Sequence, residues 1–411
     1  MPPKTFREKV AVFFAVMGPG IITAFADNDA GGIATYITAG AKYGYALLFV
    51  LLISTICLGV MQEISARIGI VTGKGLFVLI RERYGKRSAV LVMVLFLIAN
   101  IGTTASEFSG IVLSCTFFSI SKYIAVPFVA FFIWFLVVKA NYNYVEKVFF
   151  LLCATFFSYI IAGVLVEPSW PAVLTATFVP TFYQDSAYLF TAIGIIGTTI
   201  TPWGQFYMQA AIVDKGITVK DYWYTCIDII AGTFFTGLIA FFILITTATA
   251  LYGHPYMIEN VEEAAIVLEP FAGAYASVLF NVGLLGAALL AAVILPLSTA
   301  YAICEVMGLV YGINKTYREA PVFFIVYTVL IVIGAGLVLM PNISLYSVML
   351  LSQVLNGVLL SPILIFILLL SNDEKIMGSY KNNRLYHTVA WIFTILIIAL
   401  TILLFAQIFV A

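Results

Sequence analysis

The chain has 411 residues, of which 63% are hydrophobic and 10% are charged, and its formal net charge is zero. Soluble globular proteins carry about 25% charged residues, so this composition excludes that class and predicts an all-α protein embedded in the lipid bilayer. No nucleophile–base set is evident, so we do not expect an enzyme. We also expect no nucleic-acid partner and no resident cofactor.

Eleven apolar runs are long enough to cross the hydrocarbon core, which takes about 20 helical residues. In chain order they cover roughly residues 10–40, 45–70, 89–115, 123–140, 145–166, 187–213, 222–251, 272–309, 321–340, 343–371 and 387–410. The run at 272–309 is too long for one untilted crossing, so we expect it to tilt or protrude. No linker resembles a boundary, and residues 1–411 are predicted to form a single transmembrane domain.

The basic residues predict the orientation of these spans. With the N-terminus in the cytoplasm, all of the 20 lysines and arginines except Lys42 and Lys122 fall on the cytoplasmic side. This asymmetry is the known bias of cytoplasmic loops. We therefore expect a multi-pass protein of the cell membrane with a cytoplasmic N-terminus and an extracellular C-terminus, and we expect it to be monomeric.

Two of the spans carry residues that interrupt a membrane helix. The first contains "ADNDAGG" at 26–32, with Asp27, Asn28 and Asp29 inside an apolar run. Irregular backbone at membrane depth is tolerated only where protein or a water-filled cavity satisfies it, and ionisable residues there are functional candidates. The sixth span contains "GTTITPWGQ" at 197–205, where Pro202 removes a helix donor. A simple kink is a serious alternative for the sixth span alone.

The positions of these two breaks suggest an internal repeat. Residues of about 8–166 and 185–371 form two sets of five spans, and an eleventh helix follows at about 387–410. An odd number of spans places the two sets in opposite orientations. Inverted repeats whose broken helices correspond, with substrate bound at the midplane between the breaks, are the architecture of secondary transporters.

Several motifs together resemble one family, the Nramp (natural-resistance-associated macrophage protein) metal-ion transporters. They are "GPGIITAFADNDAGGIAT" (18–35), "QEISARIGIVTGKGL" (62–76), "TASEFSG" (104–110), "TPWGQ" (201–205), the run at 278–308 and "LSQVLNGVLLSP" (351–362). The order and spacing of these stretches cover nearly the whole chain. The resemblance implies a LeuT-type fold of two inverted five-helix repeats plus an eleventh helix, with helices one and six broken at the midplane.

The resemblance also implies a metal site. Asp29 matches the metal-binding aspartate of the family, Glu107 matches its third-helix glutamate, and Gln353 matches a tenth-helix glutamine. Thr198 corresponds to a residue whose backbone carbonyl faces the metal. We expect Asp29 to be the primary carboxylate.

Some positions depart from the family pattern. Gly32 stands in place of an asparagine and Thr201 in place of a methionine ligand. Thr104 replaces an acid of the family's proton route, and Trp203 and Met208 replace its two histidines.

These departures have chemical consequences. A thioether suits transition metals, whereas Mg²⁺ takes oxygen ligands and keeps several waters. The loss of the thioether and a wider cavity at Gly32 would favour a partly hydrated Mg²⁺, as in the Nramp-related magnesium transporter branch. We expect Mg²⁺ to be preferred, Mn²⁺ to be accepted, and transport not to be coupled to protons.

Alternatives stay open for several residues and for the function. Asp27 matches no family ligand, and we place it in an aqueous vestibule or near the hydration shell rather than on the ion. Glu107 could be a carboxylate satisfied by Thr103 or Thr104, and Gln353 with Asn356 could make an interhelical contact. The alternative functions are a proton-coupled Mn²⁺/Fe²⁺ transporter of Nramp type and, in another class, a LeuT-fold symporter of organic solutes.

Overall fold

The computed structural model describes residues 18–139, 142–253 and 274–410, and every regular element in these ranges is helical. The first half contains α2 (Pro19–Ala26), α3 (Ala30–Tyr43), α4 (Leu48–Thr72), α5 (Leu76–Phe117), α6 (Lys122–Lys139), α7 (Tyr142–Thr155), α8 (Phe157–Leu165) and α9 (Trp170–Phe178). The second half contains α10 (Ser186–Thr199), α11 (Pro202–Lys215), α12 (Tyr222–Leu251), α14 (Ala274–Met307), α15 (Pro321–Leu339), α16 (Leu345–Ser371), α17 (Glu374–Met377) and α18 (Arg384–Val410). Two short 3₁₀ turns, η1 (Val219–Asp221) and η2 (Gly378–Tyr380), complete the described part.

The observed helices agree with the predicted spans. Within the described ranges, nine helical stretches are long and apolar enough to cross a bilayer. The pairs α2/α3 and α10/α11 supply the two interrupted spans, and each pair is broken where the sequence indicated. Residues 10–17 of the first predicted span lie outside the described ranges.

Two features were not predicted. The first is the short helix α9, which follows α8 and packs against α4. Ser169 stands immediately before it and Pro171 lies in its first turn, and both are ordinary signals of a helix start. The second is the length of α5, which begins well before the predicted third span and kinks at Gly85.

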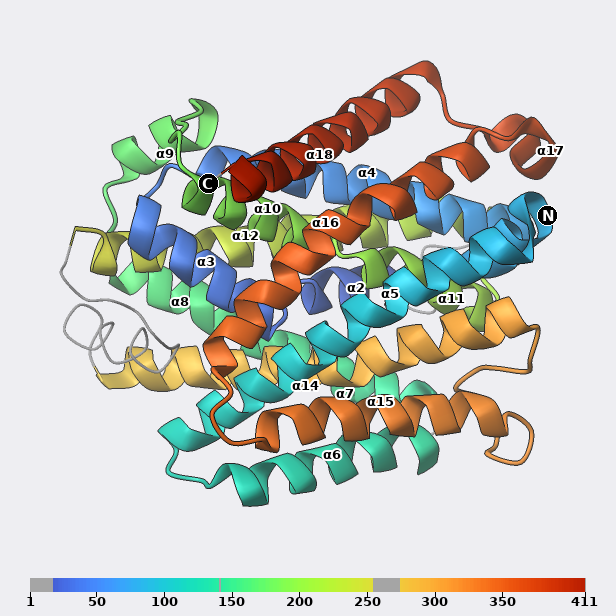
Figure 1. Cartoon of the computed structure of the whole chain (residues 1–411), viewed down its shortest axis with the longest axis horizontal. Helices are drawn as coiled ribbons and strands as arrows, with labels where there is room; N and C mark the ends of the chain where they lie inside the picture. The colour runs from blue at the N-terminus through green and yellow to red at the C-terminus, as the bar shows by residue number, and fades with distance from the viewer. Residues whose placement is uncertain (1–17, 140–141, 254–273, 411) are drawn as a thin grey trace, which may run out of the picture.

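The packing places the broken helices inside the bundle. The helix α12 packs along both α2 and α3, while α16 packs against α3, α5 and α10. In Figure 1, α2 lies near the middle of the bundle, with α18 at one edge and α6 at the opposite edge. The interrupted segments are therefore surrounded by protein, which is the condition for irregular backbone at membrane depth.

The basic loops gather at one end of the bundle. Arg83 of α5 pairs with Asp373, which precedes α17, at 2.5 Å. Arg81 donates to the backbone carbonyl of Val306, near the end of α14, at 3.1 Å. These contacts join the N-terminal part of α5 to the end of α14 and to the segment between α16 and α17. The charge pattern assigned these three regions to the same side of the membrane.

Candidate metal site

The first break spans residues 27–29, between α2 and α3. Asp29 adopts an extended backbone conformation and is the N-cap residue of α3, where its Oδ1 accepts from the N–H of Gly32 at 2.6 Å. An aspartate at this position satisfies a free helix donor and complements the positive end of the helix dipole. The sequence therefore starts a new helix at this point, and it leaves a carboxylate fully buried at its head.

The second break is narrower than predicted and covers Ile200 and Thr201. Thr201 is the N-cap residue of α11, and its Oγ1 accepts from the N–H of Gly204 at 3.1 Å. Pro202 occupies the first helical position, where its missing N–H is not needed. Both breaks are thus built in the same way, with a polar N-cap side chain restarting the helix.

Asp27 joins the two breaks. Thr201 donates its hydroxyl to Oδ1 of Asp27 at 2.6 Å, and Gln62 of α4 donates to Oδ2 at 3.2 Å. The hydroxyl of Thr198 points at the backbone carbonyl of Asp27 at 3.4 Å. Asp27 is fully buried, so the expectation that it lies in an open vestibule is wrong for this structure.

Asp29 is held by the tenth predicted span. Gln353 of α16 donates its Nε2 to both carboxylate oxygens of Asp29, at 2.9 and 3.1 Å. Asn356 donates its Nδ2 in turn to Oε1 of Gln353 at 3.1 Å. Its Nδ2 and Oδ1 also lie within hydrogen-bond distance of the hydroxyl of Thr103 in α5, at 3.1 and 3.3 Å. Asn356 therefore orients the amide of Gln353 and does not reach the carboxylate itself.

Glu107 lies on the other side of the first break. Its Oε2 accepts from the N–H of Ala30 at 3.0 Å, while its buried Oε1 has no hydrogen-bond partner among the described residues. Thr103 and Thr104 donate instead to backbone carbonyls one turn earlier in α5. The alternative in which these threonines satisfy Glu107 is therefore wrong, and one oxygen of this carboxylate is available.

Gly32 does not leave the open space that we expected. A Cβ at this position would lie 2.3 Å from Oγ1 of Thr198, 3.1 Å from Oδ1 of Asp29 and 3.4 Å from the carbonyl oxygen of Asp27. The hydroxyl of Thr198 fills the room, so the prediction of a wider cavity is wrong in this conformation. The same distances show that three oxygens of different kinds converge on one point beside Gly32.

The donor set of this region is oxygen-rich. In the ranges that the structure describes, no group of three or more His, Cys, Asp or Glu side chains is placed to hold a metal. A cation near Gly32 would be surrounded by carboxylate, hydroxyl and carbonyl oxygens, which are the ligands of hard cations. Met208 is fully buried, and its sulfur faces the hydroxyl of Thr23 at 3.9 Å.

Sequence reasoning missed one residue of the site, Gln62. It stands in the quoted motif at 62–76, and the available signal was an amide inside an apolar span. Its buried Oε1 has no partner in the described part of the chain, while its amide nitrogen reaches Asp27. Gln62 therefore brings a further element, α4, to the two breaks.

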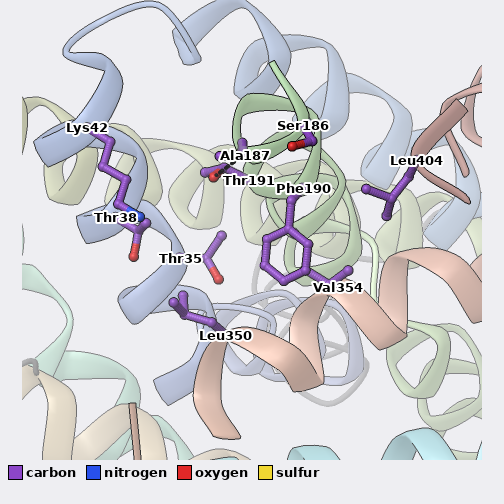
Figure 2. Close-up of a pocket in the computed structure, with 11 residues that line it drawn as sticks. Thr35, Thr38, Lys42, Ser186, Ala187, Phe190, Thr191, Leu350, Val354 and Leu404 are labelled. Carbon is purple, nitrogen blue, oxygen red and sulfur yellow. Dashed lines mark hydrogen bonds between the residues drawn. The ribbon is translucent and has the colours of Figure 1, made fainter. Parts of the chain in front are cut away.

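A cavity approaches the site from one end of the bundle (Figure 2). It has a volume of about 270 Å³ and lies between α3, α10 and α16, with Lys42 at one end and with Thr35 and Val354 toward the other. A Cβ on Gly194 would lie 3.2 Å from Thr35 and 3.6 Å from Val354, so the three helices close tightly there. Thr35 lies one helical turn from Gly31, so the cavity and the first break are both next to the N-terminal half of α3.

Comparison with known proteins decides the family. The model of the Nramp family, described as natural resistance-associated macrophage protein-like, matches residues 20–407. This chain belongs to the Nramp family. The Nramp resemblance of the separate motifs is thereby confirmed across almost the whole sequence.

Curated relatives and solved structures agree with this assignment. The chain is 26% identical over 404 residues to the divalent metal cation transporter MntH of Bacillus subtilis, covering 96% of this chain and 92% of that protein. It is 29% identical over 413 residues to MntH of Ralstonia nicotianae, with coverages of 95% and 90%.

Among solved structures, a mutant of the Eremococcus coleocola manganese transporter matches with a TM-score of 0.81 at 19% identity, covering 98% of this chain and 88% of that one. Mhp1, a nucleobase-cation-symport-1 family transporter, matches with a TM-score of 0.56 at 12% identity, with coverages of 94% and 91%. The LeuT-type fold predicted for this Nramp chain is confirmed.

Proposed function

We propose that this Nramp-family chain transports divalent metal ions, prefers Mg²⁺, accepts Mn²⁺, and moves the ion with part of its hydration shell. Divalent metal transport is supported by the similarity to the MntH divalent metal cation transporters. The preference for Mg²⁺ rests on the chemistry of the two breaks in this sequence.

The observation that carries the proposal is the contact between Thr201 and Asp27. By the resemblance, Thr201 corresponds to a methionine that is a metal ligand in the family. In this chain the hydroxyl of Thr201 lies 2.6 Å from the buried carboxylate of Asp27. A thioether would handicap Mg²⁺, whereas a hydroxyl and a carboxylate are ligands that it accepts. Asp29, Asp27 and the hydroxyls of Thr198 and Thr201 are the groups we assign to the ion or to its waters.

We further propose that transport is not coupled to protons. The positions that correspond to the histidines of the family hold Trp203 and Met208, and Thr104 replaces the acid. None of these side chains exchanges a proton near neutral pH. The two carboxylates of the first break are already engaged by amide and hydroxyl donors.

One observation favours the second candidate, a proton-coupled Mn²⁺/Fe²⁺ transporter. Glu107 is fully buried and has an oxygen without a partner among the described residues, so it could hold a proton during transport. The cytoplasmic N-terminus, the extracellular C-terminus and the monomeric state stay predictions.

The experiment that separates the two candidates is uptake of Mg²⁺ or Mn²⁺ by proteoliposomes that contain a pH-sensitive dye. The proposal expects metal uptake without acidification of the lumen. Acidification that follows the Mn²⁺ gradient, and that is lost in an Asp29→Asn variant, would support the proton-coupled candidate instead.

A further inference from the structure

A second cavity lies on the opposite side of α10 from the ion path. We call it the α10 slot, and it has a volume of about 600 Å³ between α4, α10 and α18. Its deep wall includes Ala192, Ile196 and Phe393, which are buried, whereas Leu396 on α18 is 44% exposed. The size and the apolar lining are those of a small-molecule pocket. α18 forms one wall of the slot, and only 28% of its most apolar stretch is buried within the bundle, so we infer that the slot lies next to lipid.

The mouth of the slot carries an aromatic cluster. The rings of Tyr43, Tyr183 and Tyr188 lie 5.1–5.7 Å from one another, centroid to centroid. Isolated tyrosines at span ends are ordinary interfacial anchors. Tyr183 and Tyr188 line the slot, and Tyr43 packs against both of their rings. Aromatic faces of this kind bind ammonium groups.

A carboxylate stands beside these rings. Asp185 lines the same cavity, is exposed, and begins α10 as its N-cap residue. Its Oδ1 accepts from the N–H of Tyr188 at 2.5 Å and from the hydroxyl of Tyr43 at 3.4 Å. No Lys, Arg or His of the described ranges pairs with it. The mouth therefore combines aromatic faces with an uncompensated negative charge.

A polar group inside the slot has no partner. Ser54 of α4 is 1% exposed, lines the slot, and its hydroxyl makes no hydrogen bond within the described chain. A buried hydroxyl without a hydrogen-bond partner costs stability. Position 54 is therefore one where an apolar side chain can fill the slot without the loss of a hydrogen bond.

We propose that the α10 slot binds a membrane phospholipid with an ammonium headgroup. One acyl chain occupies the apolar slot, and the ammonium group lies against Asp185 and the rings of Tyr183 and Tyr188. The charge and the aromatic faces at the mouth select the headgroup, and the bilayer next to α18 supplies the lipid. A lipid with an anionic headgroup would meet a carboxylate at the same place and is disfavoured.

The bound lipid acts on the half-helix that carries the site. Tyr188, Ala192 and Ile196 line the slot from one side of α10, while Gly194 lines the cavity on the ion path. Thr198 lies one turn beyond Gly194 and reaches Asp27. A lipid in the slot therefore packs against the face of α10 opposite the ion path. Because the headgroup determines which lipid binds, the rate of metal transport depends on the headgroup. This consequence rests on the proposed function, whereas the binding itself does not.

The test measures lipid binding directly by native mass spectrometry of the purified full-length protein. The probes are phosphatidylethanolamine, phosphatidylcholine and phosphatidylglycerol with identical acyl chains. The wild-type protein is expected to retain the two ammonium lipids about three- to fivefold more than phosphatidylglycerol, the scale of an exposed cation–π contact. Equal retention of all three lipids would overturn the headgroup assignment.

Two kinds of variant locate the site. Asp185→Asn removes the charge but keeps a good N-cap residue and the aromatic rings, and it should lower the preference for ammonium lipids below the wild-type ratio. Glu167→Gln, at another exposed carboxylate, is the matched control and should leave the preference intact. Ser54→Leu fills the slot without breaking a hydrogen bond, and Ala192→Phe fills it from α10.

Both slot-filling variants should reduce retention of every lipid by about threefold or more. This is the loss in binding expected when the lipid can no longer bury roughly one methylene group in the slot. Folding of each variant is checked by its elution as a single species. Retention equal to wild type in both folded variants would overturn the slot as the binding site. Because no metal is transported in this assay, its outcome is independent of the proposed function.

Discussion

The hydroxyl of Thr201 lies 2.6 Å from Oδ1 of Asp27 and so connects the two interrupted helices through one hydrogen bond. The two residues are 174 positions apart in the chain. Both are fully buried, together with Asp29 and Glu107. The ion path is therefore built around carboxylates that neutral donors hold in place, without a basic partner within the described ranges.

Replacement of either aspartate of the first break should stop transport. Asp29→Asn keeps an N-cap residue for α3 and removes the charge. Asp27→Asn keeps an oxygen for the hydroxyl of Thr201. We expect each to reduce Mg²⁺ uptake into proteoliposomes by about tenfold or more, a scale typical of disturbed metal sites. Uptake near the wild-type rate in Asp29→Asn would remove that residue from the site.

Glu107→Gln should have a smaller effect. The amide oxygen still accepts from the N–H of Ala30, and Glu107 touches the first break only through that backbone group. We expect a reduction of about threefold, comparable to the loss of a modest contact. The measurement is the same flux assay beside Asp29→Asn. An equally severe loss in both variants would place Glu107 directly on the ion.

Lys42 should oppose the entry of cations. Its exposed ammonium lines the cavity that leads to the site and has no ion-pair partner in the described part of the chain. Lys42→Gln is expected to lower the KM for Mg²⁺ about twofold at low ionic strength, and the difference should vanish at high salt. Lys122→Gln is the matched control, since Lys122 is the other lysine predicted on this side. An unchanged KM at low salt would show that the cavity is not on the path.

Asp228 should stabilise the fold without contributing to the site. Its carboxylate accepts from the N–H groups of Gly18, Gly20 and Ile21, at 3.2, 2.6 and 3.3 Å, and so caps α2 from the neighbouring helix α12. Asp228→Asn replaces one acceptor by a donor and should lower the stability by about 2 kcal/mol. Thermal unfolding in detergent checks this, with Glu167→Gln, at an exposed carboxylate, as the control. An unchanged Tm would contradict the cap.

Much of this arrangement could be predicted from the sequence. The apolar runs located the spans, and Asp29 and Pro202 marked the places where helices restart. Those signals are local, because an N-cap aspartate or a first-turn proline acts on its own helix. The family motifs then identified Gln353 as a residue that faces the first break, and it contacts Asp29 in the structure.

The errors concern contacts between distant segments. The space at Gly32 was expected to be open, yet the hydroxyl of Thr198 fills it from another helix. Asp27 was expected in an aqueous vestibule or near the hydration shell of the ion. Nothing near it in sequence shows that Thr201 and Gln62 enclose it. Such contacts depend on how helices pack, and neither periodicity nor spacing along one span contains that information.

Selectivity should depend on the residues at positions 32 and 201. Gly32→Asn with Thr201→Met would restore an amide and a thioether, but a Cβ at Gly32 would collide with Thr198 at 2.3 Å. The informative variant therefore adds Thr198→Ala, with Thr198→Ala alone as the control. We expect the ratio of Mg²⁺ to Mn²⁺ transport to fall by about tenfold, which corresponds to about 1.4 kcal/mol. An unchanged ratio in the folded triple variant would show that these positions do not set selectivity.

The central claim is that an oxygen-lined site between two broken helices transports Mg²⁺ in preference to Mn²⁺. Its most direct test is uptake of Mn²⁺ tracer by wild-type proteoliposomes, measured as the concentration of competing Mg²⁺ is raised at constant pH. We expect Mg²⁺ to suppress tracer uptake and to be accumulated itself, and we expect Asp29→Asn to abolish both effects. Mn²⁺ uptake that persists undiminished in a large excess of Mg²⁺ would contradict it.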